Sequence, residues 1–197
     1  MSMRDDAVAG WHVLDERVVY QHLPWLTLIE QDVRLPNGLV IKKYLLSEMP
    51  DVAMIFAITE GNEVIFVEQY KHGMGRPSLD LSAGYIDGED ASPLAAAQRE
   101  LLEETGYVSH EWTHLASLFI DPNRSKALIH YFLARHCRRA GEPHLDPTED
   151  LRVRLIPLEE VEQLAQRKRV LTVSTLAGIA LGMQSLRRSA EGTAKAP

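Results

Sequence analysis

Three glutamates near the middle of the chain, Glu100, Glu103 and Glu104, have a spacing that could hold a metal ion. Residues three and four apart are neighbours on a helix, so these carboxylates would share one face if residues 92–107 are helical. A solvated acidic face is the alternative, but there Glu100 and Glu104 would repel each other by roughly 0.2–0.5 kcal/mol. Carboxylate oxygens are the ligands that Mg²⁺ and similar hard cations prefer. With a glycine-rich loop before the segment and a glycine at its end, the spacing favours a metal site.

The stretch 92–107 carries signals for both ends of a helix. Ser92 can cap the first free amides, and Pro93 suits the first helical position, where its missing N–H costs nothing. Gly106 can adopt the left-handed conformation that ends a helix. An apolar face with spacings of three and four is formed by Leu94, Ala97 and Leu101.

Gly84 and the segment 99–107 resemble the Nudix box, G-x5-E-x7-R-E-U-x-E-E-x-G-U, in which U is a bulky apolar residue. The second half matches without a gap. Fourteen residues separate Gly84 from Arg99, one more than in the family pattern. We expect Glu89 to be the counterpart of the first glutamate of the box, with Asp90 as the other candidate.

The resemblance extends beyond the box, to the ADP-ribose pyrophosphatase-like branch of that family. Lys71 ends a V-x-Q-Y-K segment where the branch commonly has arginine. Asp80 precedes Ala83 and Gly84 at the place of a glutamate, and the segment 148–153 is similar to a loop that brings a further glutamate to the metals. The fold that this implies is α/β (α+β): a Nudix-type α/β/α sandwich with a mixed sheet, plus an N-terminal β appendage.

The resemblance also implies roles for individual residues. Glu100 and Glu104 are the expected principal ligands of Mg²⁺, for which Mn²⁺ could substitute, and the Ala83 carbonyl would complete the shell. Glu103 is a ligand or a neighbour of the ligands, and it counts with Glu104 among the catalytic residues. Arg99, also catalytic, is expected to orient a glutamate, since guanidinium can bind a carboxylate with two parallel hydrogen bonds.

Other candidates rest on weaker signals. Glu149, from the similar loop, could complete the metal shell or accept a proton from water, although a solvated loop carboxylate is an equal alternative. Lys71 and Arg76 are candidates for contacts with substrate phosphates. Trp25, which follows Pro24, is a candidate for stacking on a nucleobase.

The elements that must position these residues follow from apolar runs and turn signals. Residues 1–50 are predicted to form a β region that contributes to dimerisation and substrate contact, with a tight turn at Asn37-Gly38. Residues 51–188 are predicted to form the catalytic domain, and 189–197 a flexible tail. Within the catalytic domain we expect strands at 53–58, 64–67, 79–81, 115–120, 128–134 and 151–155, and closing helices at Leu158–Lys168 and Ser174–Leu186.

Composition narrows the class of protein. The net charge of −7 argues against nonspecific nucleic-acid binding, which needs a basic surface. No apolar run is long enough to span a membrane, and no signal segment begins the chain. One cysteine, Cys137, cannot form an intrachain disulfide and fits a reducing compartment, so cytoplasmic localisation is expected.

The predicted function is Mg²⁺-dependent hydrolysis of the pyrophosphate bond in a nucleoside diphosphate linked to another moiety. ADP-ribose, giving AMP and ribose 5-phosphate, is the leading substrate that the resemblance implies. A nucleotide-sugar pyrophosphatase of the GDP-mannose type is the alternative among enzymes. A Nudix-fold binding or regulatory protein without turnover is the alternative outside them. The protein is expected to be a homodimer.

Overall fold

The computed structural model describes residues 9–166 and 172–193. By its internal contacts the chain forms two compact units: residues 1–50 with 119–127, and residues 51–118 with 128–197. We refer to these as the N-terminal unit and the core unit, and describe each by itself.

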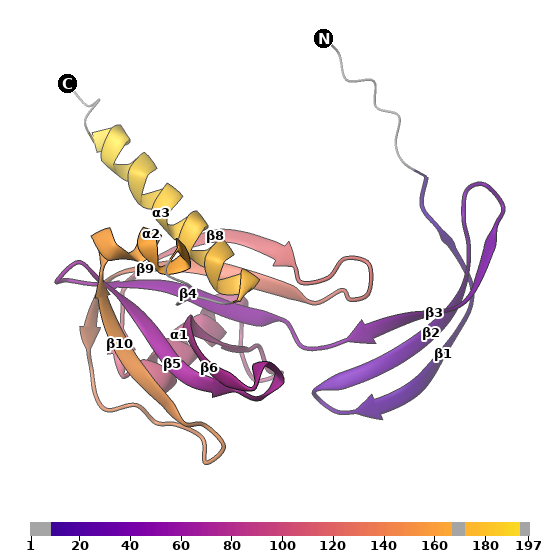
Figure 1. Cartoon of the computed structure of the whole chain (residues 1–197), viewed down its shortest axis with the longest axis horizontal. Coiled ribbons are helices and arrows are strands. Elements are labelled where there is room, and N and C mark those ends of the chain that lie inside the picture. Colours follow the sequence, from indigo (N-terminus) through magenta and orange to yellow (C-terminus); the bar gives the residue numbers. More distant parts are fainter. Residues whose placement is uncertain (1–8, 167–171, 194–197) are drawn as a thin grey trace, which may run out of the picture. The chain divides into compact units, whose positions relative to one another are not determined.

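The N-terminal unit is a three-stranded antiparallel sheet in the order β1-β2-β3 (Figure 1). Its second connection is the predicted tight turn, where Gly38 has a φ of +86° and Asn37 Oδ1 accepts a hydrogen bond from the Leu39 amide at 3.0 Å. The strands are β1 (His12–His22), β2 (Leu26–Arg34) and β3 (Val40–Glu48).

A loop from far along the chain, residues 119–127, completes this unit by binding to β3. The Tyr44 hydroxyl donates a hydrogen bond to the Asn123 carbonyl at 2.5 Å, and the Ser47 amide donates one to the Arg124 carbonyl at 2.7 Å. The Arg124 guanidinium also lies 4.3 Å from the centre of the Tyr44 ring, a cation–π contact. No local sequence signal predicted this long-range pairing.

The core unit is built on a seven-stranded mixed sheet in the order β10-β5-β6-β4-β9-β7, with β8 paired to β9. The pairing of β4 with β9 is parallel, whereas β6 pairs antiparallel with β5 through Leu81 and with β4 from Ser82 onward. The strand β6 therefore changes partner directly before Ala83 and Gly84. The strands are β4 (Val52–Thr59), β5 (Glu63–Lys71), β6 (Arg76–Tyr85), β7 (Tyr107–Val108), β8 (Glu111–Phe119), β9 (Leu128–Arg139) and β10 (Leu151–Pro157).

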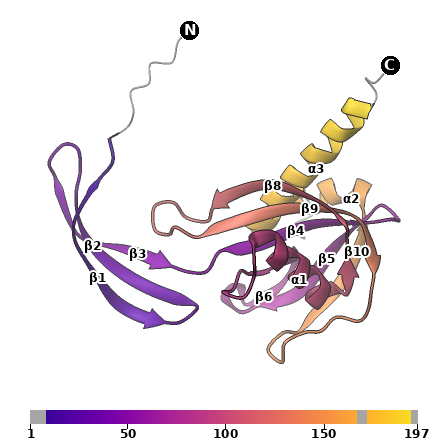
Figure 2. The same ribbon diagram turned by 180° about the vertical axis from the view of Figure 1, so that it is seen from behind.

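Helices cover both faces of this sheet, which gives the expected sandwich (Figures 1 and 2). Helix α1 (Pro93–Thr105) buries Ala96, Ala97 and Leu101 against one face, in a cluster with alternate residues of β4. Helices α2 (Leu158–Gln166) and α3 (Val173–Thr193) pack in a separate cluster on the other face. A short 3-10 helix, η1 (His72–Met74), joins β5 to β6.

The C-terminal helix is longer than predicted. Helix α3 continues to Thr193 instead of ending at Leu186, so much of the expected flexible tail is helical. Arg187, Arg188 and Ala190 favour helix, and Arg187 also pairs with Glu162 of α2, so helical propensity outweighed the loss of the apolar pattern. The predicted end of α2 at Lys168 lies outside the described residues. None of the described helices is long and apolar enough to cross a membrane.

Candidate active site

Helix α1 begins and ends as its sequence predicts. The Ser92 hydroxyl accepts a hydrogen bond from the Ala95 amide at 3.1 Å. Gly106 has a φ of +73°, and its amide donates to the Leu102 carbonyl at 2.8 Å. A Cβ at Gly106 would lie 2.3 Å from the Gly141 carbonyl oxygen, so the glycine is needed for space as well as for conformation.

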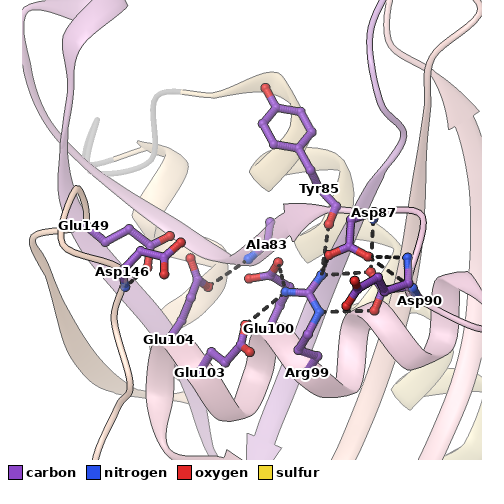
Figure 3. A network of polar contacts seen from close by, with 11 residues as sticks. Ala83, Tyr85, Asp87, Asp90, Arg99, Glu100, Glu103, Glu104, Asp146 and Glu149 are labelled. Carbon is purple, nitrogen blue, oxygen red and sulfur yellow. Dashed lines mark hydrogen bonds and ion pairs between the residues drawn. The ribbon is translucent and has the colours of Figure 1, made fainter. Parts of the chain in front are cut away.

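Glu104 is the most deeply buried glutamate of the helix, with 4% of its surface exposed. Its carboxylate accepts a hydrogen bond from the Ala83 amide of β6 at 3.0 Å (Figure 3). Burial raises the pKa of Glu104 to about 8; the nearby Ser82 hydroxyl and the Ala83 amide oppose this rise, whereas the charge of Glu100 adds to it. The fold thus places the Glu104 carboxylate in surroundings that disfavour its charged form.

Glu100 stands one helical turn earlier and lies against the backbone of Gly84. A Cβ at Gly84 would lie 2.0 Å from the Glu100 carboxyl carbon, so only glycine leaves room for this carboxylate. Burial raises the pKa of Glu100, while its hydrogen bond with Arg99 opposes the rise. Gly84, the first glycine of the box, therefore leaves the space that the Glu100 carboxylate occupies.

Arg99 links the loop before the helix to two of the glutamates. Its guanidinium donates to both carboxylate oxygens of Asp90, at 3.1 and 2.9 Å, and to the Tyr85 carbonyl at 3.1 Å. One further nitrogen is shared between Glu100 at 2.7 Å and Glu103 at 2.9 Å (Figure 3). Arg99 therefore contacts two glutamates while it is anchored on Asp90, and its role in orienting them stays a prediction.

Asp90, the second candidate for the first carboxylate position of the box, binds Arg99 in this geometry, whereas no bond between Glu89 and Arg99 is found among the described residues. The Asp90 side chain is 6% exposed, and its bond to Arg99 lowers its pKa. The reason lies in the turn before the helix, where Asp87 Oδ1 accepts from the amides of Glu89 and Asp90 at 2.7 and 3.1 Å. This turn directs Asp90, not Glu89, toward Arg99.

Glu103 and Glu149 lie at the margin of this cluster. Glu103 is partly exposed, and its carbonyl accepts from the His144 amide at 2.8 Å, which ties the loop before β10 to the helix. Glu149, on the same loop, accepts a hydrogen bond from the Asp146 amide at 3.1 Å. Its charge raises the pKa values of Glu100 and Glu104, and it lies beside Glu104, away from Arg99 (Figure 3). The fold thus brings this loop carboxylate to the glutamate helix.

The two buried glutamates fit a divalent cation. Within residues 9–166 and 172–193, no three His, Cys, Asp or Glu side chains converge on one point at which they could hold a metal ion. Mg²⁺ in phosphate-processing sites usually takes one or two carboxylates and leaves other positions to water and substrate oxygens. Glu100 and Glu104 match that need, and a cation beside them would offset the cost of their buried charge.

Lys71 and Arg76 face each other directly across the β5–β6 hairpin. Two like charges directly opposite each other repel, and an anion bound between them would offset that repulsion. Arg76 precedes Ala83 by seven residues on one strand, up to about 23 Å at roughly 3.3 Å per residue. The structure does not bring this pair to the glutamate cluster.

Trp25 belongs to the N-terminal unit, where it follows a cis Leu23-Pro24 peptide and is 53% exposed. Its role toward a substrate stays a prediction.

Sequence reasoning left three contributors unassigned or second in rank. Asp90 was the second choice, although its count from Gly84 matches the five-residue gap of the box. The Tyr85 carbonyl bonds Arg99, and Ser82 lies near Glu104; neither has a sequence signal. Backbone acceptors and strand neighbours become visible only when the pairing of β6 is known.

The mixed sheet with a glutamate-bearing helix packed beside a glycine of β6 defines a class of hydrolase. The NUDIX domain family matches residues 49–173, and a nucleoside diphosphate sugar hydrolase N-terminal domain matches residues 11–44. The chain belongs to the Nudix family.

Two relatives and one solved structure describe its place more closely. ADP-ribose pyrophosphatase of Bacillus subtilis (strain 168) is 30% identical over 176 residues, covering 88% of this chain and 90% of that protein. Methanol dehydrogenase activator of Bacillus methanolicus is 31% identical over 150 residues, covering 75% and 80%. A crystal structure of an ADP compounds hydrolase has a TM-score of 0.81 at 21% identity, covering 93% of this chain and 97% of that chain, and it shows the shared fold.

These similarities place the chain among Nudix hydrolases of the ADP-ribose pyrophosphatase-like branch. Nudix hydrolases generally use divalent metal ions, which agrees with the chemistry of the Glu100 and Glu104 carboxylates.

Proposed function

We propose that the protein hydrolyses the pyrophosphate bond of ADP-ribose to AMP and ribose 5-phosphate, with Mg²⁺ bound by Glu100 and Glu104. The main support for this proposal is the pair of buried glutamates, Glu100 and Glu104, that pack against β6. Gly84 has no side chain, which leaves room for the Glu100 carboxylate. Its similarity to ADP-ribose pyrophosphatase over 88% of the chain supports this substrate class. We place this activity in the cytoplasm.

In the proposed reaction, Glu100, Glu104 and the Ala83 carbonyl hold the cation. A bound Mg²⁺ neutralises phosphate charge and lowers the pKa of a coordinated water. Arg99 keeps the Glu100 carboxylate turned toward Gly84 and limits the negative charge at the helix surface. Glu103 shares Arg99 with Glu100, so it adjusts the charge of the cluster from its margin.

Glu149 is our candidate to accept the proton of the attacking water. It reaches the cluster from a separate loop, on the side of Glu104 that Arg99 does not occupy (Figure 3). No arginine or lysine bonds it among the described hydrogen bonds and ion pairs, so its carboxylate remains available to a water.

The N-terminal unit is proposed to form a homodimer interface. Every residue of β1 is exposed, including Val13, Val18 and Tyr20, so the edge strand offers apolar surface and unpaired backbone groups. We propose that Trp25 of this unit stacks on the base, and that Lys71 and Arg76 bind an anionic group of the substrate distant from the cation.

Two alternatives each have a specific observation behind them. The match of residues 11–44 to a nucleoside diphosphate sugar hydrolase N-terminal domain favours a nucleotide-sugar substrate, such as GDP-mannose. The similarity to a methanol dehydrogenase activator raises the possibility of a regulatory role. The intact glutamate helix argues against a protein that has lost turnover.

The test is a hydrolysis screen of the intact chain against ADP-ribose, nucleotide sugars, NADH, FAD and nucleoside triphosphates. Each reaction is run with Mg²⁺, with Mn²⁺ and with EDTA, and the products are identified by ³¹P NMR. We expect metal-dependent release of AMP from ADP-ribose at the highest kcat/KM. Triphosphates cleaved far faster than any diphosphate-linked compound would contradict the substrate assignment.

A further inference from the structure

A row of buried hydroxyl and carboxylate groups lies along β6. Ser78, Asp80 and Ser82 occupy alternate positions of the strand, and the last of them, Ser82, lies near Glu104. Ser78 and Asp80 are buried, and Ser78 Oγ and Asp80 Oδ2 make no hydrogen bond within the described part of the chain. Buried polar atoms almost always have a partner, so the free oxygen of Asp80 indicates a missing one.

The other oxygen of Asp80 is well satisfied. Asp80 Oδ1 accepts hydrogen bonds from the Thr172 hydroxyl at 2.7 Å and from the Thr175 hydroxyl at 2.9 Å. Thr175 is completely buried at the start of α3, whose first turn is completed by the Leu176 amide donating to the Thr172 carbonyl. Each hydroxyl gives its one proton to Oδ1, and the Thr172 hydroxyl oxygen also accepts a hydrogen bond from the Thr175 amide at 3.4 Å. A lone pair on each threonine oxygen remains to coordinate a further group.

Among the described residues, no basic side chain balances the charge of Asp80. The residue is 4% exposed, and no lysine, arginine or histidine forms an ion pair with it within residues 9–166 and 172–193. The amino end of α3 offers partial positive charge, equivalent to about half an elementary charge. An ionised carboxylate removed from water normally requires a paired charge or a bound cation.

We propose that Asp80, Thr172 and Thr175 bind an alkali-metal cation, K⁺ or Na⁺, through Asp80 Oδ2 and the threonine hydroxyl oxygens. The donors are hard oxygens, which suit such a cation and not a soft transition metal. The set contains one carboxylate and otherwise neutral hydroxyls, so a single positive charge balances it. The cation would join the middle of β6 to the first turn of α3.

This site is separate from the proposed Mg²⁺ site. Its ligands come from β6 and from Thr172 and Thr175 at the start of α3, whereas Glu100 and Glu104 belong to α1. The inference does not depend on the substrate or on turnover, and the two can fail independently. Its consequence is a monovalent-cation dependence of stability in protein stripped of divalent ions.

The experiment measures thermal unfolding of the full chain in EDTA, titrated with KCl, NaCl or choline chloride at one fixed ionic strength. Choline carries the same charge as K⁺ but shields it with methyl groups, so it controls for ionic screening. We expect K⁺ or Na⁺ to raise the melting temperature with a saturable midpoint, by about 3–6 °C at tenfold above its Kd. Identical melting curves in K⁺, Na⁺ and choline would overturn the proposal and leave water as the occupant.

Variants locate the effect. Asp80→Asn keeps the shape of the side chain but removes its charge, and it should abolish the cation dependence. Glu160→Gln, which removes an exposed charge from α2, is the matched control and should keep it. A cation response that persists unchanged in Asp80→Asn would place the ion elsewhere and overturn the assignment.

If Asp80→Asn does not fold, the pair Thr172→Val and Thr172→Ser replaces it. Loss of one coordinating hydroxyl in Thr172→Val should move the midpoint of the titration at least tenfold higher. Thr172→Ser should restore it. Equal midpoints in the two variants would contradict coordination by this hydroxyl.

Discussion

The N-terminal sheet and helix α1 both carry many charges, but they arrange them in opposite ways. On the sheet, two surface ion pairs match one basic side chain with one acidic side chain, Arg17 with Glu30 and Lys42 with Asp32. On α1 one arginine serves three carboxylates, and Glu104 is buried without any basic partner among the described residues. The exposed ion pairs are balanced within the sheet, whereas the buried negative charge of α1 requires a bound ligand to balance it.

The largest effect that the comparison predicts is on turnover of Glu104→Gln. The substitution keeps the size of the side chain but deletes one negative charge from the proposed cation site. We expect turnover at saturating Mg²⁺ to fall by roughly two orders of magnitude or more, about 2.7 kcal/mol of transition-state stabilisation. Metal-free melting should show no loss of stability, because the repulsion between Glu100 and Glu104 is relieved.

Steady-state kinetics and thermal melts of both proteins, measured side by side, check this expectation. Near-normal turnover would remove Glu104 from the ligand set. Activity lost together with folding would support a structural role for the charge.

Gly84→Ala sharpens the comparison by displacing a glutamate without changing any charge. Its Cβ would lie 2.0 Å from the carboxyl carbon of Glu100, so the carboxylate must move. We expect kcat/KM to fall at least about tenfold, which corresponds to 1.36 kcal/mol. Gly88→Ala is the control, since nothing lies within 4 Å of its Cβ; equal activities in the two variants would show that the seat of Glu100 is not critical.

The buried charge also predicts how stability depends on pH in EDTA. The pKa of Glu104 is about 8 in the folded protein and ordinarily 4.5, so the native state binds this proton more tightly than the unfolded chain. Its contribution to stability is full below pH 4.5 and is lost as pH rises through 8, at about 1.36 kcal/mol per pKa unit as an upper scale. Denaturant unfolding from pH 4.5 to 9 measures it.

The readout is the difference between wild type and Glu104→Gln, because other carboxylates titrate in both. The stability of wild type relative to the variant should decline across this range. Added Mg²⁺ should reduce the decline by stabilising the charged carboxylate. A constant difference between the two proteins would mean that Glu104 is not perturbed by burial.

A smaller effect is expected at the anchor of Arg99. Asp90→Asn removes the charge of the carboxylate that Arg99 binds with two hydrogen bonds, and should cost roughly 1–3 kcal/mol of unfolding free energy. Glu89→Gln, one residue away, should change it by less than about 0.5 kcal/mol. Urea unfolding distinguishes them, and the reverse order would restore Glu89 as the counterpart of the first glutamate in the box.

The smallest effect is predicted on the N-terminal sheet. Lys42→Met breaks the exposed pair with Asp32 and should leave the melting temperature within about 2 °C of wild type. Its hydrolytic activity should also be unchanged. A large loss of stability would show that charge matching on the sheet contributes more than an exposed pair ordinarily does.

The features predicted well from sequence were those set by local chemistry. The cap at Ser92, the left-handed Gly106 and the spacing of the glutamates depend on residues within one helix, so α1 was defined by its own sequence. The turn at Asn37-Gly38 was predictable for the same reason. The fold class followed from the resemblance of the helix and its flanking glycine to a known family.

The features that escaped prediction depend on pairing between distant segments. The change of partner along β6 places Ser82 and Asp80 in buried surroundings, and no pattern within the strand announces it. The choice of Asp90 over Glu89 depends on how Asp87 closes the turn before the helix. The attachment of residues 119–127 to β3 joins parts of the chain that are far apart in sequence.

Binding of Mn²⁺, followed by the loss of its free-ion EPR signal, tests most directly whether the unmatched carboxylates of α1 bind a divalent cation. Wild type, Glu104→Gln and Lys42→Met are titrated without substrate. The account predicts saturable binding to wild type and Lys42→Met, and at least tenfold weaker binding to Glu104→Gln. Equal affinity in wild type and Glu104→Gln would contradict the assignment of the buried glutamates as a cation site.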